Sequence, residues 1–148
     1  MNIFPLILLL LADPDSAKLT LIPNTREILQ RDNLLLLTLL ENKSISAVKL
    51  FGELRSGARW FRYEIQEKGK WVTIRPSSDQ LGPSDVVGDG PWLNGKSTYA
   101  ETEALHRRSM RGAFLFETPG TYKIRAVATM PWGVVGARRV DVSPRKTG

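Results

Sequence analysis

Short stretches in which hydrophobic and polar residues alternate recur along the whole chain. Residues 17–23 place Leu19 and Leu21 against Lys18 and Thr20 and end at Pro23, which predicts a short edge strand. Further strands are expected at residues 47–54, 59–66 and 70–76, on both sides of Pro119–Gly120 within 112–130, and at 133–143. Because turn residues separate these short runs and no long amphipathic helix is evident, the pattern predicts an antiparallel β-sandwich.

Two stretches leave the type of element open. Residues 34–40 read LLLLTLL, with Thr38 as the single polar residue, and are too short to span a membrane. They predict a strand that is buried on both faces or central in one sheet, and a buried helix is the competing interpretation. Residues 98–107 favour a strand over a short helix.

A hairpin is expected where residues 59–66 and 70–76 are joined by Glu67-Lys68-Gly69. In this arrangement Phe61, Tyr63 and Ile65 share one face, and Trp60 and Trp71 stand side by side on the other. From Ser77 to Ser97 the alternation disappears among glycines, prolines and aspartates, which predicts a long surface loop.

The stretch FETPGTYKIRAVA, residues 116–128, places a tyrosine directly after a tight turn. In a sandwich, a tyrosine near the start of the penultimate strand can pack its ring inward and bond its hydroxyl to the backbone a few residues upstream. Tyr122, with the turn at Pro119 and Gly120, is therefore expected to form the corner where the chain passes between two sheets.

Three stretches, LLLLTLLENKS, FETPGTYKIRAVA and RRVDVS, resemble the bacterial immunoglobulin-like sandwich domains. The resemblance implies an all-β, antiparallel immunoglobulin-like Greek-key sandwich of seven to nine strands over residues 18–143. The chain is also similar to the intracellular proteinase inhibitors of bacilli, which share the strand ending in Asn and the Pro-Gly-x-Tyr turn. The inhibitors' binding loop has no match here, so no functional residue is carried over.

The first residues, MNIFPLILLLLADPDSA, contain a nine-residue apolar run from Phe4 to Ala12. This run is far shorter than a membrane span and matches the core of a signal peptide, with a cut expected after Ala17. We therefore expect a signal peptide at 1–17, a flexible tail at 144–148, and a secreted or periplasmic location. A first strand packed in the core of a cytoplasmic protein is the alternative.

Composition removes several kinds of chemistry. The 148 residues fit one domain, and the absence of cysteine excludes disulfides, a thiol nucleophile and cysteine-ligated metal sites. His106 is the only histidine, and no G-x-S-x-G motif accompanies it, so we expect no catalytic triad, no zinc triad and no cofactor. The net charge of +6 suits an anionic partner, although the basic residues are scattered.

Candidate binding residues remain among the tryptophans and arginines. Trp60, Trp71 and Trp92 could anchor a protein or stack on a sugar, unless packing covers them. Arg107 and Arg108 belong to the densest basic cluster, expected near Arg138 and Arg139. That cluster lacks the aromatic residues of a single-stranded nucleic-acid surface, which makes nucleic acid an unlikely partner.

We therefore expect an exported, non-catalytic module that acts through protein or cell-surface contact, in adhesion or as an accessory subunit. A carbohydrate-binding module that uses exposed tryptophans is one alternative, and a proteinase-inhibitor module is another.

Overall fold

The computed structural model describes residues 14–54, 58–74, 86–107, 112–128 and 132–145, which form an almost entirely β-stranded fold. The strands are β1 (Ala17–Pro23), β2 (Glu27–Leu29), β3 (Leu34–Asn42), β4 (Val48–Leu54), β5 (Ala58–Arg59), β6 (Arg62–Glu67), β7 (Lys70–Ile74), β8 (Val86–Leu93), β9 (Thr98–Leu105), β10 (Gly120–Ala128) and β11 (Val134–Ser143). A short 3₁₀ helix, η1 (Pro14–Ser16), precedes them. The described ranges thus hold eleven strands, where seven to nine were expected.

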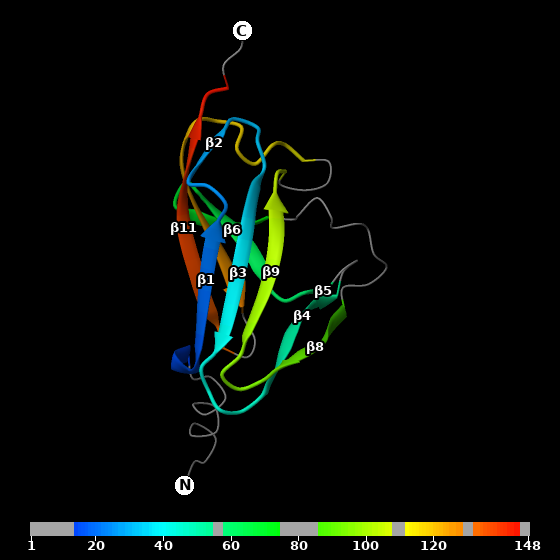
Figure 1. The fold of residues 1–148 in the computed structure, drawn as a ribbon. Helices are drawn as coiled ribbons and strands as arrows, with labels where there is room; N and C mark the ends of the chain where they lie inside the picture. Colours follow the sequence, from blue (N-terminus) through cyan, green and yellow to red (C-terminus); the bar gives the residue numbers. More distant parts are fainter. Residues whose placement is uncertain (1–13, 55–57, 75–85, 108–111, 129–131, 146–148) are drawn as a thin grey trace.

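The strands form three sheets with the orders β1-β3-β9, β2-β11-β10-β6-β7 and β5-β4-β8. All pairings are antiparallel except the short parallel pairing of β2 with β11. Figure 1 shows β1, β3 and β9 lying across β11 and β6, with the smaller sheet of β4, β5 and β8 to one side. The prediction of a mainly antiparallel all-β fold is confirmed.

The main core lies between the β1-β3-β9 sheet and the β2-β11-β10-β6-β7 sheet. One residue in two along the facing strands is buried there, including Leu19, Leu21, Leu34, Leu36, Leu40, Tyr63, Ile65, Ile124, Ala126, Val140 and Val142. A polar contact crosses this core between the Thr38 and Tyr63 hydroxyl oxygens, which lie 2.9 Å apart. Since each hydroxyl satisfies the other, two polar groups can be buried between the sheets.

The prediction for β3 is confirmed in one of its two forms, a strand that is central in one sheet. It is the central strand between β1 and β9, so the competing helix is excluded. Its side chains alternate between buried and exposed, however, and Leu35 and Leu37 are 43% and 36% exposed. Leucine on both faces of a strand gives no two-residue period, and this is why the sequence left burial on both faces open beside the central position.

The expected hairpin is present as β6 and β7, with Glu67 opposite Lys70. Lys68 and Gly69 between them have φ angles of 50° and 79°. Two central residues with positive φ make the tight turn that matches the twist of paired strands.

Two expected segments differ in the structure. The loop predicted for 77–97 contains β8, which pairs with β4 despite its glycines and proline, while 75–85 lie outside the described residues. The strand expected before Pro119 is instead an irregular segment, joined to Arg107 by one bridge at Phe114. Long-range pairing decided both cases, because strand propensity depends strongly on the neighbouring strands.

The corner at Tyr122 has the geometry that its position in the sequence suggested. The Tyr122 hydroxyl donates a hydrogen bond to the Thr118 carbonyl oxygen at 2.5 Å, four residues upstream. The ring is half-buried and meets Phe116 edge-on, with the ring centroids 5.4 Å apart. Gly120, which begins β10, has a φ of 149°.

The two ends of the chain are only partly described. The expected signal peptide falls mostly on residues 1–13, which lie outside the described residues. The expected cut after Ala17 falls at the first position of β1, where Ala17 is buried. At the other end Arg145, in the expected tail, bonds the Gln30 carbonyl and pairs with Asp32.

Candidate interaction surfaces

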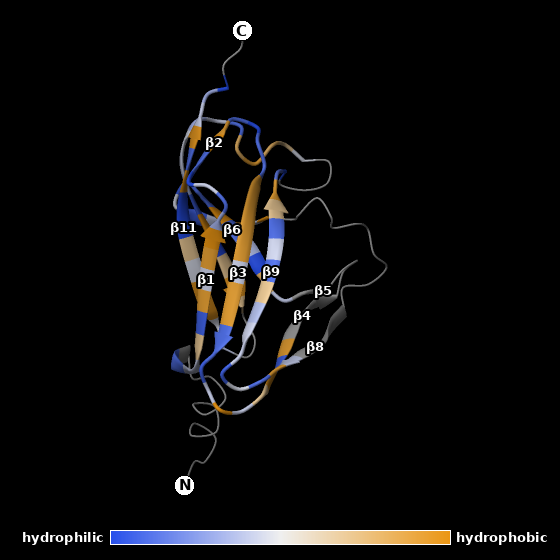
Figure 2. Cartoon of the chain, in the orientation of Figure 1, coloured by the Kyte–Doolittle hydropathy of each residue, from blue (hydrophilic) through white to orange (hydrophobic). Residues whose placement is uncertain are grey.

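The outer face of the β1-β3-β9 sheet carries no charged side chain over most of its length. The strand registers place eight outward residues together, here called the leucine face: Thr20, Ile22, Leu35, Leu37, Leu39, Ala100, Thr102 and Ala104. Ile22, Leu35 and Leu37 are 42%, 43% and 36% exposed. In Figure 2 the hydrophobic colour runs along β1 and β3. An antiparallel sheet with one solvent-facing side usually presents polar residues there, so this face has the composition of a covered one.

The outer face of the opposite sheet has the usual polar character. Charged side chains project from β6, β10 and β11 at Arg62, Glu64, Lys123, Arg125, Arg139 and Asp141. Glu64 is only 6% exposed, because Arg125 pairs with it at 2.7 Å and Arg62 lies 3.5 Å from its other oxygen. The two sides of the molecule therefore differ sharply in charge.

The structure does not bring Trp60 and Trp71 together. Trp71 lies opposite Gln66 in the hairpin. Gln66 follows Trp60 by six residues, and six residues of extended chain span about 20 Å. The Arg125 guanidinium covers the Trp71 ring, with its carbon 4.2 Å from the ring centroid. The predicted aromatic pair for a sugar ring is absent from this face, because the hairpin register separates the two rings.

Trp60 packs against the core instead of standing free. It is partly buried and its indole N–H bonds the Tyr99 hydroxyl of β9, on the opposite sheet. Burial raises the pKa of the Tyr99 phenol above its ordinary value, the nearby Glu101 charge adds to this, and the Trp60 bond opposes it. Trp60 thus closes the side of the sandwich, which was the alternative left open by the sequence.

Trp92 is the most exposed tryptophan in the described part of the chain, at 62%. It lies opposite Lys49 in the pairing of β8 with β4, and the Lys49 ammonium sits 5.2 Å from its ring centroid. Tryptophan is enriched among the residues that carry most of the binding energy at interfaces. Trp92 therefore remains a candidate binding residue.

Trp92 belongs to what we call the loop tip, residues 42–49 and 92–97, where the turns that join β3 to β4 and β8 to β9 meet with the adjoining ends of these strands. The buried Asn42 amide group donates to the Ser46 and Leu93 carbonyls at 2.9 and 3.2 Å and accepts from Ser44 N at 3.1 Å. The backbones also touch, since Lys96 N donates to the Ser44 carbonyl at 2.9 Å. This network fixes the backbone on both sides of Ile45, whose side chain is 88% exposed.

Arg107 lies at the opposite end of the sandwich and takes part in a structural cluster. Its guanidinium carbon lies 4.1 Å from the Phe114 ring centroid, and Arg31 approaches the same ring at 5.7 Å. The single histidine, His106, also packs edge-on against Phe114. Arg139 lies instead in mid-sheet opposite Lys123, and Arg108 is outside the described residues.

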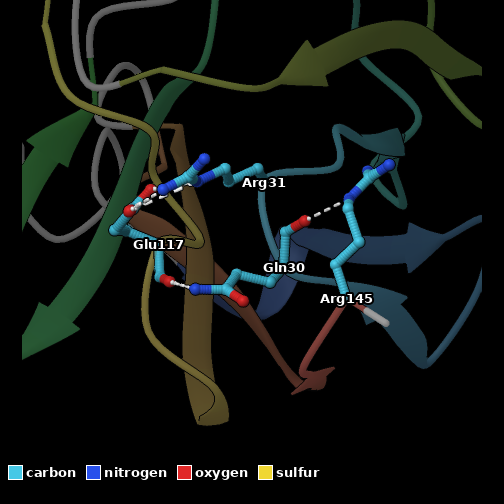
Figure 3. A network of polar contacts seen from close by, with 4 residues as sticks. All are labelled: Gln30, Arg31, Glu117 and Arg145. Carbon is cyan, nitrogen blue, oxygen red and sulfur yellow. Dashed lines mark hydrogen bonds and ion pairs between the residues drawn. The ribbon is translucent and has the colours of Figure 1, made fainter. Parts of the chain in front are cut away.

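A polar network at this end joins three separate segments (Figure 3). Arg31 and Glu117 form an ion pair at 2.9 Å, which raises the pKa of the Arg31 guanidinium above its ordinary value. The Gln30 side chain donates to the Glu117 carbonyl at 2.6 Å, and Arg145 donates to the Gln30 carbonyl at 3.2 Å. Because each of these polar groups has a partner inside the chain, the network holds the segments together.

No grouping of three or more His, Cys, Asp or Glu side chains suited to a metal ion occurs among the described residues. Within the same ranges, no helix has the length and apolar character needed to cross a membrane.

Comparison with known proteins shows likeness of fold alone. No protein-family model matches the sequence, and no curated protein matches it either. A β-glucosidase from Erythrobacter marinus matches with a TM-score of 0.50 and 12% identity, over 86% of this chain and 15% of that one. A Pseudomonas fluorescens alkylpurine DNA glycosylase bound to DNA containing an abasic site analogue matches with a TM-score of 0.52 and 15% identity, over 86% of this chain and 30% of that one.

The CARDB domain of a Pyrococcus furiosus protein matches with a TM-score of 0.49 and 10% identity, over 86% of this chain and 94% of that domain. The chain spans less than a third of the length of the β-glucosidase and of the DNA glycosylase. At these identities the comparisons support a β-rich fold and no particular activity.

Proposed function

We propose that the chain is an immunoglobulin-like, non-catalytic module that binds another protein through its leucine face. The strand orders support the fold type, because β1-β3-β9 and β11-β10-β6-β7 correspond to the two sheets of that sandwich. The hydroxyl bond from Tyr122 to Thr118 supports it too, as a tyrosine corner at the start of the penultimate strand.

The absence of charge on the leucine face is the observation that carries the binding proposal. On the outer side of this sheet, charge is confined to one end, at Lys18 and Glu41, and the eight residues of the leucine face are uncharged. The centres of protein interfaces are depleted in charge in the same way. Three partly exposed large hydrophobic residues grouped on one sheet give such a centre, and burying the exposed part of each contributes about 1 kcal/mol.

A protein partner fits this face better than a sugar or a nucleic acid. The eight residues include no aromatic ring for stacking on a sugar or base and no cation for phosphate. The two threonines and the aliphatic side chains suit a flat apolar surface on another protein.

The proposal is tested by affinity capture from the native host with three versions of the protein. We expect a specific set of proteins to be retained by the parent and by the Lys123→Ala control, and lost with Leu37→Lys. Lys123 is exposed on the opposite, charged face. Identical sets for all three versions would contradict the proposal. Self-association of the parent that Leu37→Lys abolishes would show that a second copy covers the face.

We also propose that the module is exported, on the strength of the apolar run from Phe4 to Ala12. The mature chain from the native host should begin near Lys18 when its N-terminus is measured by mass spectrometry. An intact Met1 on the soluble cytoplasmic protein would contradict export.

A further inference from the structure

The loop tip combines features that the leucine face lacks. Ile45 is 88% exposed and Trp92 is 62% exposed, so each projects most of its side chain into solvent. Three lysines accompany them in the two segments, Lys43, Lys49 and Lys96. Residues 42–49 and 92–97 contain no acidic residue. Asp15 and Glu41 lie beside them in η1 and β3, where Glu41 is opposite Lys18.

The backbone beneath these side chains is fixed before any partner arrives. The Asn42 side chain bonds both loops, and a Cβ atom built on Gly95 would lie 2.2 Å from the Ile45 carbonyl oxygen. The two loops therefore touch at a point where only glycine fits. A loop held in this way loses little conformational entropy on binding, so the exposed side chains act from a rigid base.

We propose that the loop tip binds the surface of an anionic lipid bilayer, with Ile45 and Trp92 inserted at the interface and the lysines against the headgroups. Tryptophan is enriched where a bilayer meets water, because its ring is apolar and its N–H is polar. Each lysine held near an anionic leaflet strengthens binding about fivefold. The net charge of +6 directs the chain toward such a surface.

A lipid surface suits the tip better than a protein does. Lysine is depleted in protein interfaces, where arginine is preferred, and the tip has three lysines and no arginine. The tip lies at one end of the molecule, at the turns that join β3 to β4 and β8 to β9. It includes no residue of the leucine face, so each proposal can fail while the other holds.

The test is co-sedimentation of the full chain with vesicles of phosphatidylcholine alone or mixed with phosphatidylglycerol. We expect binding only to the mixed vesicles, weakening as salt is raised. Ile45→Asn and Trp92→Ala should each lower the apparent affinity about tenfold, because each removes an apolar group from the interface. The double variant Lys43→Glu, Lys96→Glu should lose about 25-fold or more.

Matched controls lie at the other end of the molecule and on the charged face. Leu29 is 44% exposed on β2, which pairs with the last residues of β11, so Leu29→Asn mirrors the Ile45 change away from the tip. The double variant Lys68→Glu, Lys123→Glu makes the same change in net charge, and Lys68 has a positive φ as Lys96 does. Both controls should bind within about twofold of the parent, since charges more than a Debye length from the bilayer are largely screened.

Several results would overturn the proposal. The parent could fail to bind mixed vesicles, or the controls could lose as much affinity as the tip variants. Unchanged binding by both Ile45→Asn and Trp92→Ala would indicate adsorption by charge without insertion. Full competition by soluble glycerol phosphate would indicate a site for a free phosphate group. A protein captured through the tip, with no vesicle binding, would assign the tip to a protein pocket.

Discussion

The leucine face and the loop tip both expose hydrophobic side chains, but their surroundings differ. The leucine face is the outer side of a hydrogen-bonded sheet and none of its eight residues is charged. The tip projects from two loops and carries three lysines with its exposed Ile45 and Trp92. Exposure alone would assign the two regions to one kind of partner. The charges around each region separate them, because an uncharged flat face suits protein and a cationic tip suits an anionic surface.

The two regions are also held in place differently. The backbone of the leucine face belongs to a continuous hydrogen-bonded ladder, so its outward side chains can change without disturbing the fold. The tip depends on one buried side chain, Asn42, and on one close backbone contact, at Gly95. Substitutions should therefore affect function alone on the face, and both stability and function at the base of the tip.

The largest expected effect is on the free energy of unfolding, and it differs between substitutions on the two sides of β3. Leu36 is fully buried and Leu37, next to it, is 36% exposed on the leucine face. Leu36→Lys should lower the free energy of unfolding by about 4 kcal/mol or more, because it buries a charge without a partner. Leu37→Lys should change it by less than about 0.5 kcal/mol. Urea titration of both variants measures this, and similar losses in both would mean that the leucine face is itself packed in the core.

An intermediate effect is expected at the base of the tip. Asn42→Ala leaves several buried polar groups without partners, and it should lower the free energy of unfolding by about 2–4 kcal/mol. Asn33→Ala, at an exposed position before β3, is the control and should be close to neutral. Equal unfolding midpoints for the parent and Asn42→Ala in urea would show that the loops are not held by this side chain.

A smaller effect is expected at Gly95. In Gly95→Ala the new methyl group would meet the Ile45 backbone, so the loops must move apart at a cost of about 1–3 kcal/mol. Lys96→Ala, one residue later on the surface, should leave stability unchanged. Thermal unfolding of the two variants compares them directly. A Gly95→Ala protein as stable as Lys96→Ala would indicate that the two loops can separate freely.

The alternating segments allowed most of the sheet to be predicted from sequence. β1 was predicted with its observed bounds, and the β6–β7 hairpin and β11 within a few residues. β8 was missed because Gly88, Gly90 and Pro91 indicate a loop, whereas its strand form comes from pairing with β4. For β3, the sequence could not decide between burial on both faces and a central place in one sheet, because leucine on both of its faces conceals which side is covered.

The candidate sites were less predictable, because exposure is a property of the folded chain. Trp92 was named from its residue type, and Trp60 and Trp71 were expected together although the hairpin register separates them. Ile45 was missed, since a single isoleucine between two serines gives no periodic pattern. The strand that ends in Asn42 was noticed, yet the bonds of its amide to two distant loops depend on tertiary contacts.

The account's central claim is that the leucine face and the loop tip bind different partners. A crossed binding measurement tests it most directly, with the parent, Leu37→Lys and Ile45→Asn each assayed against the captured protein and against phosphatidylglycerol-containing vesicles. We expect Leu37→Lys to lose the protein and keep the vesicles, and Ile45→Asn to do the reverse, both with the parent's unfolding midpoint. Loss of both ligands by either folded variant would contradict the claim and would make the two regions parts of one binding surface.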